Sequence, residues 1–416
     1  FSFNEEGRQE AGLDEDFIQE LKVCARSKGR TPNVFWFNPG AEESLVPGWR
    51  GADSPAAQQV GRDLALLPAY LARREDVVIV PEIPSTEFLR GLMEAGVELP
   101  ELVAEHEIEG VADRKLHELR PWARTPDALP VIERLGQPCE LTAPELFSKG
   151  THAHFLANLL GRSESPILSG AGEVGRVVSS EEEVRGWLEE TTAAECVLKA
   201  PFSTAGRERL IRRCADPPSP GELAWIEAVL DAQGCLVIEP WLERVLDFSL
   251  HYDFRREDGL RRRGQVVLTN RRQGQFGSAT VADRITDFLD EPSRRSLFAG
   301  ASRRGHLGEF IEDSLEPALV GLLEEHGYHG PLGVDAFLYR GKDGDLRFKP
   351  VVEINPRYTM GRVAIELARI RRFKTRATLT IAKASVPPPG GAIRLTPGNP
   401  KTRFAAYTDC QNSLPK

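Results

Sequence analysis

The chain has 416 residues, of which 41% are hydrophobic and 28% are charged, and its formal net charge is −9 at pH 7. This is the composition of a soluble globular protein that is too long for one ordinary core, so we expect two or three domains. The acidic balance disfavours a nucleic-acid-binding protein, which usually carries a surplus of basic residues. Local basic clusters, such as Arg369 to Lys374, are interpreted as solvated surface.

The cysteines and the hydropathy of the sequence exclude further classes of protein. The six cysteines are scattered without a Cys-x-x-Cys pair, which argues against a zinc site and a disulfide framework and fits a reducing cytoplasm. No apolar run approaches the roughly 20 residues of a membrane helix. The first residues, FSFNEEGRQE, do not resemble a signal peptide, although the missing initiating Met suggests that residues precede Phe1. We expect a cytoplasmic protein without a membrane partner.

The first part of the chain alternates between strand and helix patterns. NVFWFNPGAEE (33–43) and DVVIVPEIP (76–84) predict buried strands, and helices are predicted over 54–74 and 85–96, the second with Ser85 as N-cap. This alternation predicts a parallel, doubly wound sheet. The turn NPGAEE lacks the G-x-G-x-x-G pattern, so a dinucleotide site is not indicated.

From about residue 140 the pattern starts again. The Pro/Gly-rich stretch 385–400 is expected to be irregular. No internal repeat is present. Helices are predicted at 148–161, 179–190, 221–234 and 357–370, and strands at 195–202, 234–241, 262–272 and 333–340.

Two segments after predicted strands suit a nucleotide. Lys199 ends the run VLK and precedes the loop APFSTAGRER, where an ammonium group, loop amides and hydroxyls can approach a phosphate chain. A lysine that extends from a strand edge into solvent is an equally frequent explanation. Glu239, Trp241 and Leu242 follow the strand LVI and can face an adenine ring, although a plain strand ending in a turn is commoner.

Asp335, Glu353 and Asn355 carry hard oxygen atoms on two predicted strands joined by the turn RGKDGD (340–345). If these strands pair as a hairpin, the three side chains converge at one end. Mg²⁺ prefers a few protein oxygens together with water and substrate phosphate. A metal would also turn the repulsion between neighbouring carboxylates into attraction. A solvated hairpin without a metal is the alternative.

No other catalytic arrangement competes with this one. The eight histidines show no motif spacing, and no Ser–His–Asp or Cys–His arrangement is evident. His152 and His154 fall on different sides of a predicted helix, so they make a poor metal pair.

The order of these features resembles the ATP-grasp superfamily of carboxylate–amine and carboxylate–thiol ligases. The resemblance runs through Lys149, VLKAPFSTAGRE, VIEPWLERVLD, GVDAF and VVEINPR, and it covers roughly residues 30–375. It implies a Rossmann-like pre-ATP-grasp domain at 1–140, with FWFNPG on the substrate side. A two-lobed α+β ATP-grasp domain is implied to follow, with a small lobe at 141–245 and a large lobe with an irregular tail at 246–416.

The resemblance implies ATP and Mg²⁺ as cofactors and assigns roles to particular residues. The loop STAGRER departs from the family in carrying a single glycine, where several are frequent. The implied nucleotide contacts are Lys149 and Lys199 on the α- and β-phosphates, Ser203, Thr204 and Gly206 in a flap over them, Glu239, Trp241 and Leu242 around adenine, and Asp247 at the ribose, with Glu243 as its alternative.

The reacting end is implied by the same resemblance. Asp335, Glu353 and Asn355 would hold one or two Mg²⁺, and Arg357 would face the acyl-phosphate or the substrate carboxylate. Arg271, in TNRRQG, is a further phosphate-facing candidate, with Arg272 equally available.

The implied activity is ATP-dependent ligation of a small-molecule carboxylate and an amine, with release of ADP and phosphate. The variable substrate is expected between FWFNPG and the ATP lobes. A kinase built on the same lobes is one alternative. A non-catalytic nucleotide-binding module is another, but the retention of all three metal ligands disfavours it. A homodimer is left open.

Overall fold

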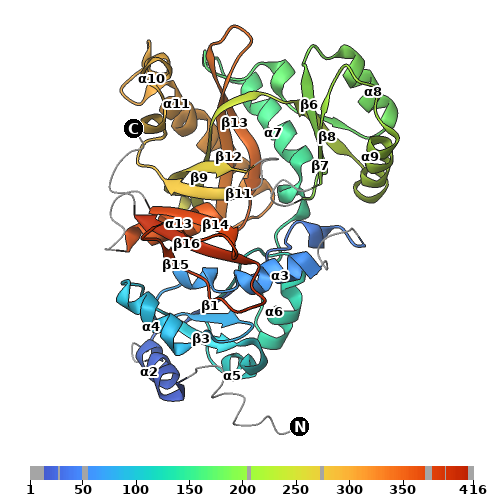
Figure 1. Ribbon diagram of the computed structural model, residues 1–416. Helices are drawn as coiled ribbons and strands as arrows, with labels where there is room; N and C mark the ends of the chain where they lie inside the picture. The colour runs from blue at the N-terminus through green and yellow to red at the C-terminus, as the bar shows by residue number, and fades with distance from the viewer. Residues whose placement is uncertain are drawn as a thin grey trace.

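The computed structural model describes residues 14–26, 29–48, 55–203, 208–271, 276–370, 377–388 and 390–410. Three β-sheets follow one another along the described chain, as Figure 1 shows. The first is parallel, and the other two are antiparallel. A parallel α/β unit followed by antiparallel α+β units is the predicted fold class, which is therefore confirmed.

The first sheet has four strands in the order β3-β2-β1-β4. Val34 of β1 lies opposite Val77 of β2 and Leu119 of β4, and Val34 and Val77 are fully buried. Burial on both faces is typical of parallel strands covered by helices. The elements are β1 Asn33–Trp36, β2 Val77–Val80, β3 Glu101–Ala104 and β4 Glu118–Pro121, with helices α2 Glu15–Arg26, α3 Pro55–Asp63, α4 Thr86–Glu94, α5 Glu109–Ala112 and α6 Leu129–Leu135.

One helix of this region is shorter than predicted. The expected helix at 54–74 ends at Asp63, and a separate 3₁₀ turn covers Leu67–Tyr70. Pro68 lacks the amide proton that an α-helix would require at that position. The Ser85 cap of α4 is confirmed, because its hydroxyl accepts a hydrogen bond from the amide of Phe88 at 3.4 Å.

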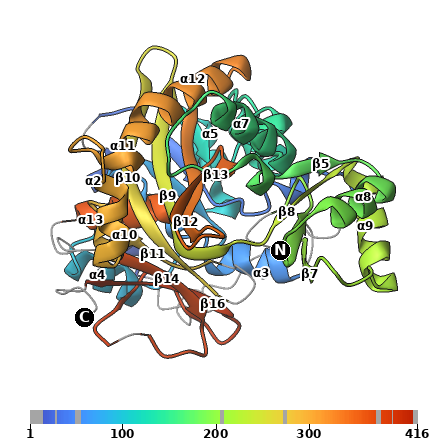
Figure 2. The ribbon, with the colours of Figure 1, turned by 90° about the horizontal axis from the view of Figure 1, so that it is seen from above.

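The second sheet has the order β5-β8-β6-β7 and its own small core. Strands β5 and β7 were not predicted. β7 is an edge strand with the sequence RLIRR, and its arginines weaken the apolar signal that identifies a strand. Figure 2 shows this lobe, with α8 and α9, projecting from the rest of the molecule. The elements are α7 Lys149–Gly161, β5 Arg176–Val178, α8 Glu181–Glu190, β6 Glu195–Lys199, β7 Arg209–Arg213, α9 Pro220–Gln233 and β8 Leu236–Pro240.

The third sheet has eight strands in the order β13-β12-β9-β10-β11-β14-β16-β15. β12 and β13 form the predicted hairpin, with Arg340 opposite Leu346 beside the turn and Asp335 opposite Glu353. The elements are β9 Glu243–Arg255, β10 Gly259–Asn270, β11 Phe276–Val281, α10 Glu291–Phe298, α11 Gly305–Phe310, α12 Glu316–Glu325, β12 Gly330–Arg340, β13 Leu346–Asn355, α13 Met360–Arg369, β14 Ala377–Lys383, β15 Ile393–Arg394 and β16 Phe404–Cys410.

The C-terminal part is more ordered than expected, because β14 and β16 extend the sheet on either side of the Pro/Gly-rich stretch. Among the described residues of that stretch, only Ile393–Arg394 forms a strand. Leu395 is fully buried, and its carbonyl accepts a hydrogen bond from the hydroxyl of Tyr70 at 2.5 Å. Contacts with the first sheet region therefore fix a segment whose composition predicts no regular structure.

One hydrophobic core joins the first and third sheets. It contains Phe35 and Tyr70 from the N-terminal region together with Ile365 of α13 and Leu379 of β14. Figure 1 shows α13 and the β14–β16 part of the eight-stranded sheet on the side that faces the N-terminal sheet. A cavity is lined by residues from both of these regions. In the described part of the chain, no helix combines the length and apolarity needed to cross a bilayer.

Candidate functional site

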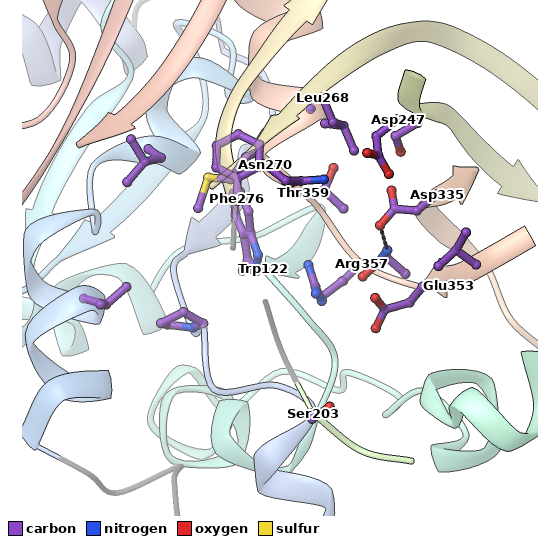
Figure 3. Close-up of a pocket in the computed structure, with 18 of the residues that line it drawn as sticks. Trp122, Ser203, Asp247, Leu268, Asn270, Phe276, Asp335, Glu353, Arg357 and Thr359 are labelled. Carbon is purple, nitrogen blue, oxygen red and sulfur yellow. Dashed lines mark hydrogen bonds between the residues drawn. The ribbon is translucent and has the colours of Figure 1, made fainter. Parts of the chain in front are cut away.

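A cavity of about 450 Å³ is lined by residues from all three sheet regions, among them Trp122, Arg209 and Asp335. Figure 3 shows how its labelled side chains converge on this space. Nine of the residues predicted from the sequence line the cavity: Lys149, Lys199, Ser203, Asp247, Arg271, Asp335, Glu353, Asn355 and Arg357. Thr204, Gly206 and Arg272 lie outside the described residues.

The hairpin end brings the three predicted metal ligands together. Asp335 on β12 lies opposite Glu353 on β13, and the Asn355 amide donates a hydrogen bond to Asp335 Oδ2 at 3.2 Å. Burial and the neighbouring Glu353 carboxylate raise the pKa of Asp335 to about 7. The charge of Arg357 opposes this rise only in part. Two facing carboxyl groups of this kind form a site that a cation would stabilise.

Lys149 links this hairpin to the loop after β6. Its ammonium group lies 2.9 Å from Glu353 Oε1 and donates to the carbonyl of Ser203 at 2.6 Å. Burial alone would raise the pKa of Glu353, but the charge of Lys149 lowers it below the usual value. The Ser148 hydroxyl accepts from the amide of Gly150 at 3.2 Å and caps α7, which places Lys149 in the first turn.

His152 supports the hairpin from the same helix. Its Nε2 lies 2.8 Å from the carbonyl of Leu146, and its Nδ1 accepts from the amide of Ile354 at 3.4 Å. Burial lowers the pKa of His152 to about 4, so the ring is neutral at pH 7. His154 is exposed, in agreement with the prediction that the two do not form a metal pair. Among the described residues, no three His, Cys, Asp or Glu side chains are grouped to hold a metal by themselves.

Glu239 is placed behind Lys199. Its carboxylate accepts a short contact from Lys199 and an ion pair from Lys349 at 2.7 Å, and all three residues are buried. Burial would raise the pKa of Glu239, but the two ammonium groups lower it to about 2. The Glu239 carboxylate thus orients Lys199. Sequence reasoning missed Lys349, which lies in the middle of an apolar strand and carries no motif.

Two arginines that the sequence analysis missed line the cavity beside Trp241. The guanidinium carbons of Arg209 and Arg244 lie 5.6 Å and 5.0 Å from the centre of the Trp241 ring. Arg244 Nη1 donates to Asp247 Oδ1 at 2.7 Å. Arg209 Nη2 and Arg244 Nε are buried and have no hydrogen-bond partner among the described residues. Buried donors usually have acceptors, so these two suit a ligand rich in oxygen.

Trp241 and Leu242 form the link between β8 and β9, and neither lines the cavity as the described residues shape it. The amide of Trp241 is bonded to the carbonyl of Glu195 at 2.9 Å. The link is next to the cavity, because Arg209 and Arg244 line the cavity and also contact the Trp241 ring.

Arg357 is held from the N-terminal region. Its Nε and Nη2 contact Glu42 Oε1 at 2.8 Å and 2.7 Å, and its Nη1 donates to the carbonyl of Tyr358 at 3.2 Å. Burial would lower the pKa of Arg357, but the Glu42 carboxylate keeps it above the usual value. Glu42 belongs to the turn NPGAEE, whose acids received no role from the sequence. The sequence feature that could have identified these acids is their position in a loop directly after a buried strand, because such loops often carry functional residues.

Arg271 differs from the other predicted cations. It is exposed, and its guanidinium donates to the carbonyl of Ile381 in β14. It therefore contributes to the rim of the cavity.

Positive side chains outnumber negative ones around the cavity. Counting described residues, its lining holds six lysines and arginines against four acids, and Asp335 is one of the four. An excess of cations in a concave, partly buried site attracts anionic ligands. The cations are Lys149, Lys199, Arg209, Arg244, Arg271 and Arg357, and the acids are Glu43, Asp247, Asp335 and Glu353.

No protein-family model matches the sequence, and no curated protein matches it. Solved structures do match. An N5-carboxyaminoimidazole synthetase from Staphylococcus aureus complexed with ADP has 11% identity and a TM-score of 0.47, over 92% of this chain and 94% of that chain. An N5-carboxyaminoimidazole ribonucleotide synthetase from Thermus thermophilus has 15% identity and a TM-score of 0.49 over the same shares.

An L-amino acid ligase from Bacillus licheniformis is also matched, with 12% identity and a TM-score of 0.42 over 92% of this chain and 94% of that chain. All three likenesses are at low identity and have TM-scores below 0.5. The chemistry of the site rests on the residues of this chain.

Proposed function

We propose that this chain is an ATP-dependent carboxylate–amine ligase of the ATP-grasp type. It would activate a small-molecule carboxylate as an acyl-phosphate, join it to an amine as an amide or peptide bond, and release ADP and phosphate. The proposal rests on side chains from separate parts of the chain that converge on one cavity and together suit a triphosphate, a divalent cation and a carboxylate.

One observation supports the nucleotide most directly. Arg209 and Arg244 present buried donors without partners among the described residues, and Lys149 and Lys199 line the same cavity. Buried cationic donors bind phosphate oxygens more strongly than donors in water do, because little solvent competes for them. Asp247, which accepts from Arg244, is the proposed partner of the ribose hydroxyls.

The residues at the hairpin fit Mg²⁺. Asp335 and Glu353 supply two facing carboxylates, Asn355 supplies an amide oxygen, and burial beside Glu353 keeps the Asp335 pKa high until a cation is present. These three residues would hold the metal. When bound, Mg²⁺ would neutralise the phosphate charge that develops during phosphoryl transfer.

Positioning and charge neutralisation then account for the chemistry. Lys149 and Lys199 would align the phosphate chain, and Arg357 would hold the carboxylate that attacks the terminal phosphate. Such a reaction requires no covalent enzyme nucleophile. The amine would attack the acyl carbon from the open side of the cavity.

The test begins with Mg·ATP binding. At 100 times its Kd, Mg·ATP should stabilise the fold by about 2.7 kcal/mol, which a melting curve detects. Arg209→Gln should weaken that effect, whereas Arg213→Gln, an exposed arginine on the same strand, should not. A melting temperature unmoved by millimolar Mg·ATP contradicts the proposal.

Product identity is the second part of the test. Chromatography after incubation with candidate acids and amines should show ADP and phosphate together with an amide. AMP and pyrophosphate would indicate adenylation and remove the acyl-phosphate. A stable phosphorylated product would favour the kinase.

A further inference from the structure

The cavity has an apolar end that the nucleotide and the metal do not require. Figure 3 shows Trp122 and Phe276 on one side of Arg357 and the acids Asp335 and Glu353 on the other. The proposed nucleotide and metal residues account for the acidic and cationic end. The apolar lining includes Phe37, Trp122, Leu268, Phe276, Met360 and Phe404.

The aromatic wall is held by its own packing. Trp122 is 4% exposed, and its ring meets that of Phe37 edge-on at 4.8 Å between centroids. Tyr358 lies behind Trp122 at 6.2 Å between ring centroids. Aromatic rings packed in this way keep their orientation, so the surface is formed before a ligand arrives.

The polar side chains near the aromatic rings are mostly uncharged. Figure 3 labels Asn270 and Thr359 there, and the described lining also includes His251, Glu43 and, at the rim, Arg271. A strongly polar substrate would lose hydrogen bonds to water against such a wall without recovering them. An apolar group would instead gain from leaving water, at about 25 cal/mol for each Å² buried.

Arg357 supplies a fixed point between the two ends. The Glu42 carboxylate accepts from Nε and Nη2 of Arg357, and the Tyr358 carbonyl accepts from Nη1. A guanidinium has five donors, and the described residues engage three of those on Arg357, so a donor on each terminal nitrogen is left for a ligand. Donors on two neighbouring nitrogens can meet the two oxygens of a carboxylate.

We propose that the acid substrate carries a large apolar body, aryl or branched alkyl, which binds against Trp122, Leu268 and Phe276. Its carboxylate would meet Arg357 and face the terminal phosphate of ATP. This inference rests on the proposed function, which requires the carboxylate of the acid to point toward ATP. The apolar chamber, formed by Trp122, Leu268 and Phe276, would then select the acid by its size and hydrophobicity.

Binding of defined acids tests the inference without requiring turnover. The probes form two matched pairs, 3-phenylpropionate with propionate and L-phenylalanine with glycine, and succinate serves as a polar acid. Calorimetry with the full chain and Mg·ADP should show the large member of at least one pair binding about tenfold or more tighter than the small one. Succinate should bind no better than propionate.

Variants then locate the chamber. Phe276→Ala should weaken binding of the preferred large acid about fivefold to tenfold and leave its small counterpart within about twofold. Phe298→Ala is the matched control, because Phe298 is 39% exposed on α10 and lies outside the cavity. Circular dichroism would show whether Phe276→Ala folds. If it does not, Leu268→Ala, on a neighbouring strand, provides the same test.

The outcomes separate this inference from the proposed function. If Mg·ATP stabilises the chain but both pairs bind equally, or succinate binds best, the chamber does not select apolar acids. If the large acids bind and respond to Phe276→Ala while no ADP forms with any acid and amine, the chamber is supported and the ligase proposal fails.

Discussion

The two ends of the cavity differ in chemistry and in how their residues are distributed along the chain. At the reacting end, the proposed metal ligands Asp335, Glu353 and Asn355 lie on a single hairpin, within 21 residues of each other, and the lysines and acids of this end stand in local sequence patterns. The apolar end takes Phe37 and Phe404 from opposite ends of the chain. The reacting end is thus specified by residue type, whereas the apolar end is specified by where the sheets meet.

The largest effect is expected from a substitution at the reacting end, and it is a loss of turnover. Glu353→Gln should lower turnover by about 100-fold to 1,000-fold, because it removes one of two facing carboxylates and the partner of Lys149. The fold should remain, since the side chain faces the cavity. Steady-state kinetics at saturating Mg·ATP measure the loss.

Glu190→Gln is the matched control, because Glu190 forms an exposed ion pair with Arg176. It should retain full turnover. Normal activity of the Glu353 variant with Mg²⁺ would remove the metal assignment.

The boundary between the two ends is tested by Gly361. A Cβ at this position would clash with His251 Nε2 and lie 2.9 Å from Val266 Cγ2, and both neighbours are buried. Gly361→Ala should therefore lower the free energy of unfolding by about 3 kcal/mol, as overpacking of a core does. Urea denaturation measures it.

Gly321→Ala should change the free energy of unfolding in the opposite direction. Gly321 is an exposed residue of α12 with no atom within 4 Å of the added Cβ, so alanine should raise the free energy of unfolding by about 0.5–1 kcal/mol. Equal effects at the two glycines would mean that the packing around His251 is looser than described.

Arg357→Lys tests the residue that both ends share. Lysine keeps the charge but loses the planar fork that can meet Glu42 and a carboxylate together, so kcat/KM for the acid should fall about 30-fold. Arg369→Lys should change it less than twofold, because Arg369 is half exposed and pairs with Glu366 on the outside of α13. Similar losses in both variants would contradict a specific role for the guanidinium.

The last prediction concerns pH. The pKa of Asp335 is about 7 in the fold, against about 3.9 in an unfolded chain. Its stabilising contribution is present below about pH 4 and is lost as pH rises through 7. Without metal, the free energy of unfolding of the unsubstituted protein should thus fall by up to about 1.4 kcal/mol per pH unit between about pH 4 and pH 7, compared with that of Asp335→Asn.

Urea denaturation in EDTA at several pH values measures this difference. Mg²⁺ added at pH 7 should stabilise the parent and leave Asp335→Asn unchanged. Stability curves that run parallel for the two proteins would show that Asp335 ionises normally.

The sequence alone determined the order of elements and most of the reacting end. The helix cap at Ser85, the alternation of strand and helix, and the hairpin turn at 340–345 are local signals, and the structure contains each of them. The acids and lysines could be named because phosphates and metals require particular residue types. Local chemistry was sufficient there.

Tertiary structure decided the rest. The ion pair of Glu42 with Arg357 joins residues 315 positions apart, and Lys349 meets Glu239 across 110 positions. Trp122, Leu268 and Phe276 look like core residues in the sequence, because an apolar side chain that faces a cavity has the same pattern as one that faces another strand. Only the packing of the first sheet against the third left these residues beside open space.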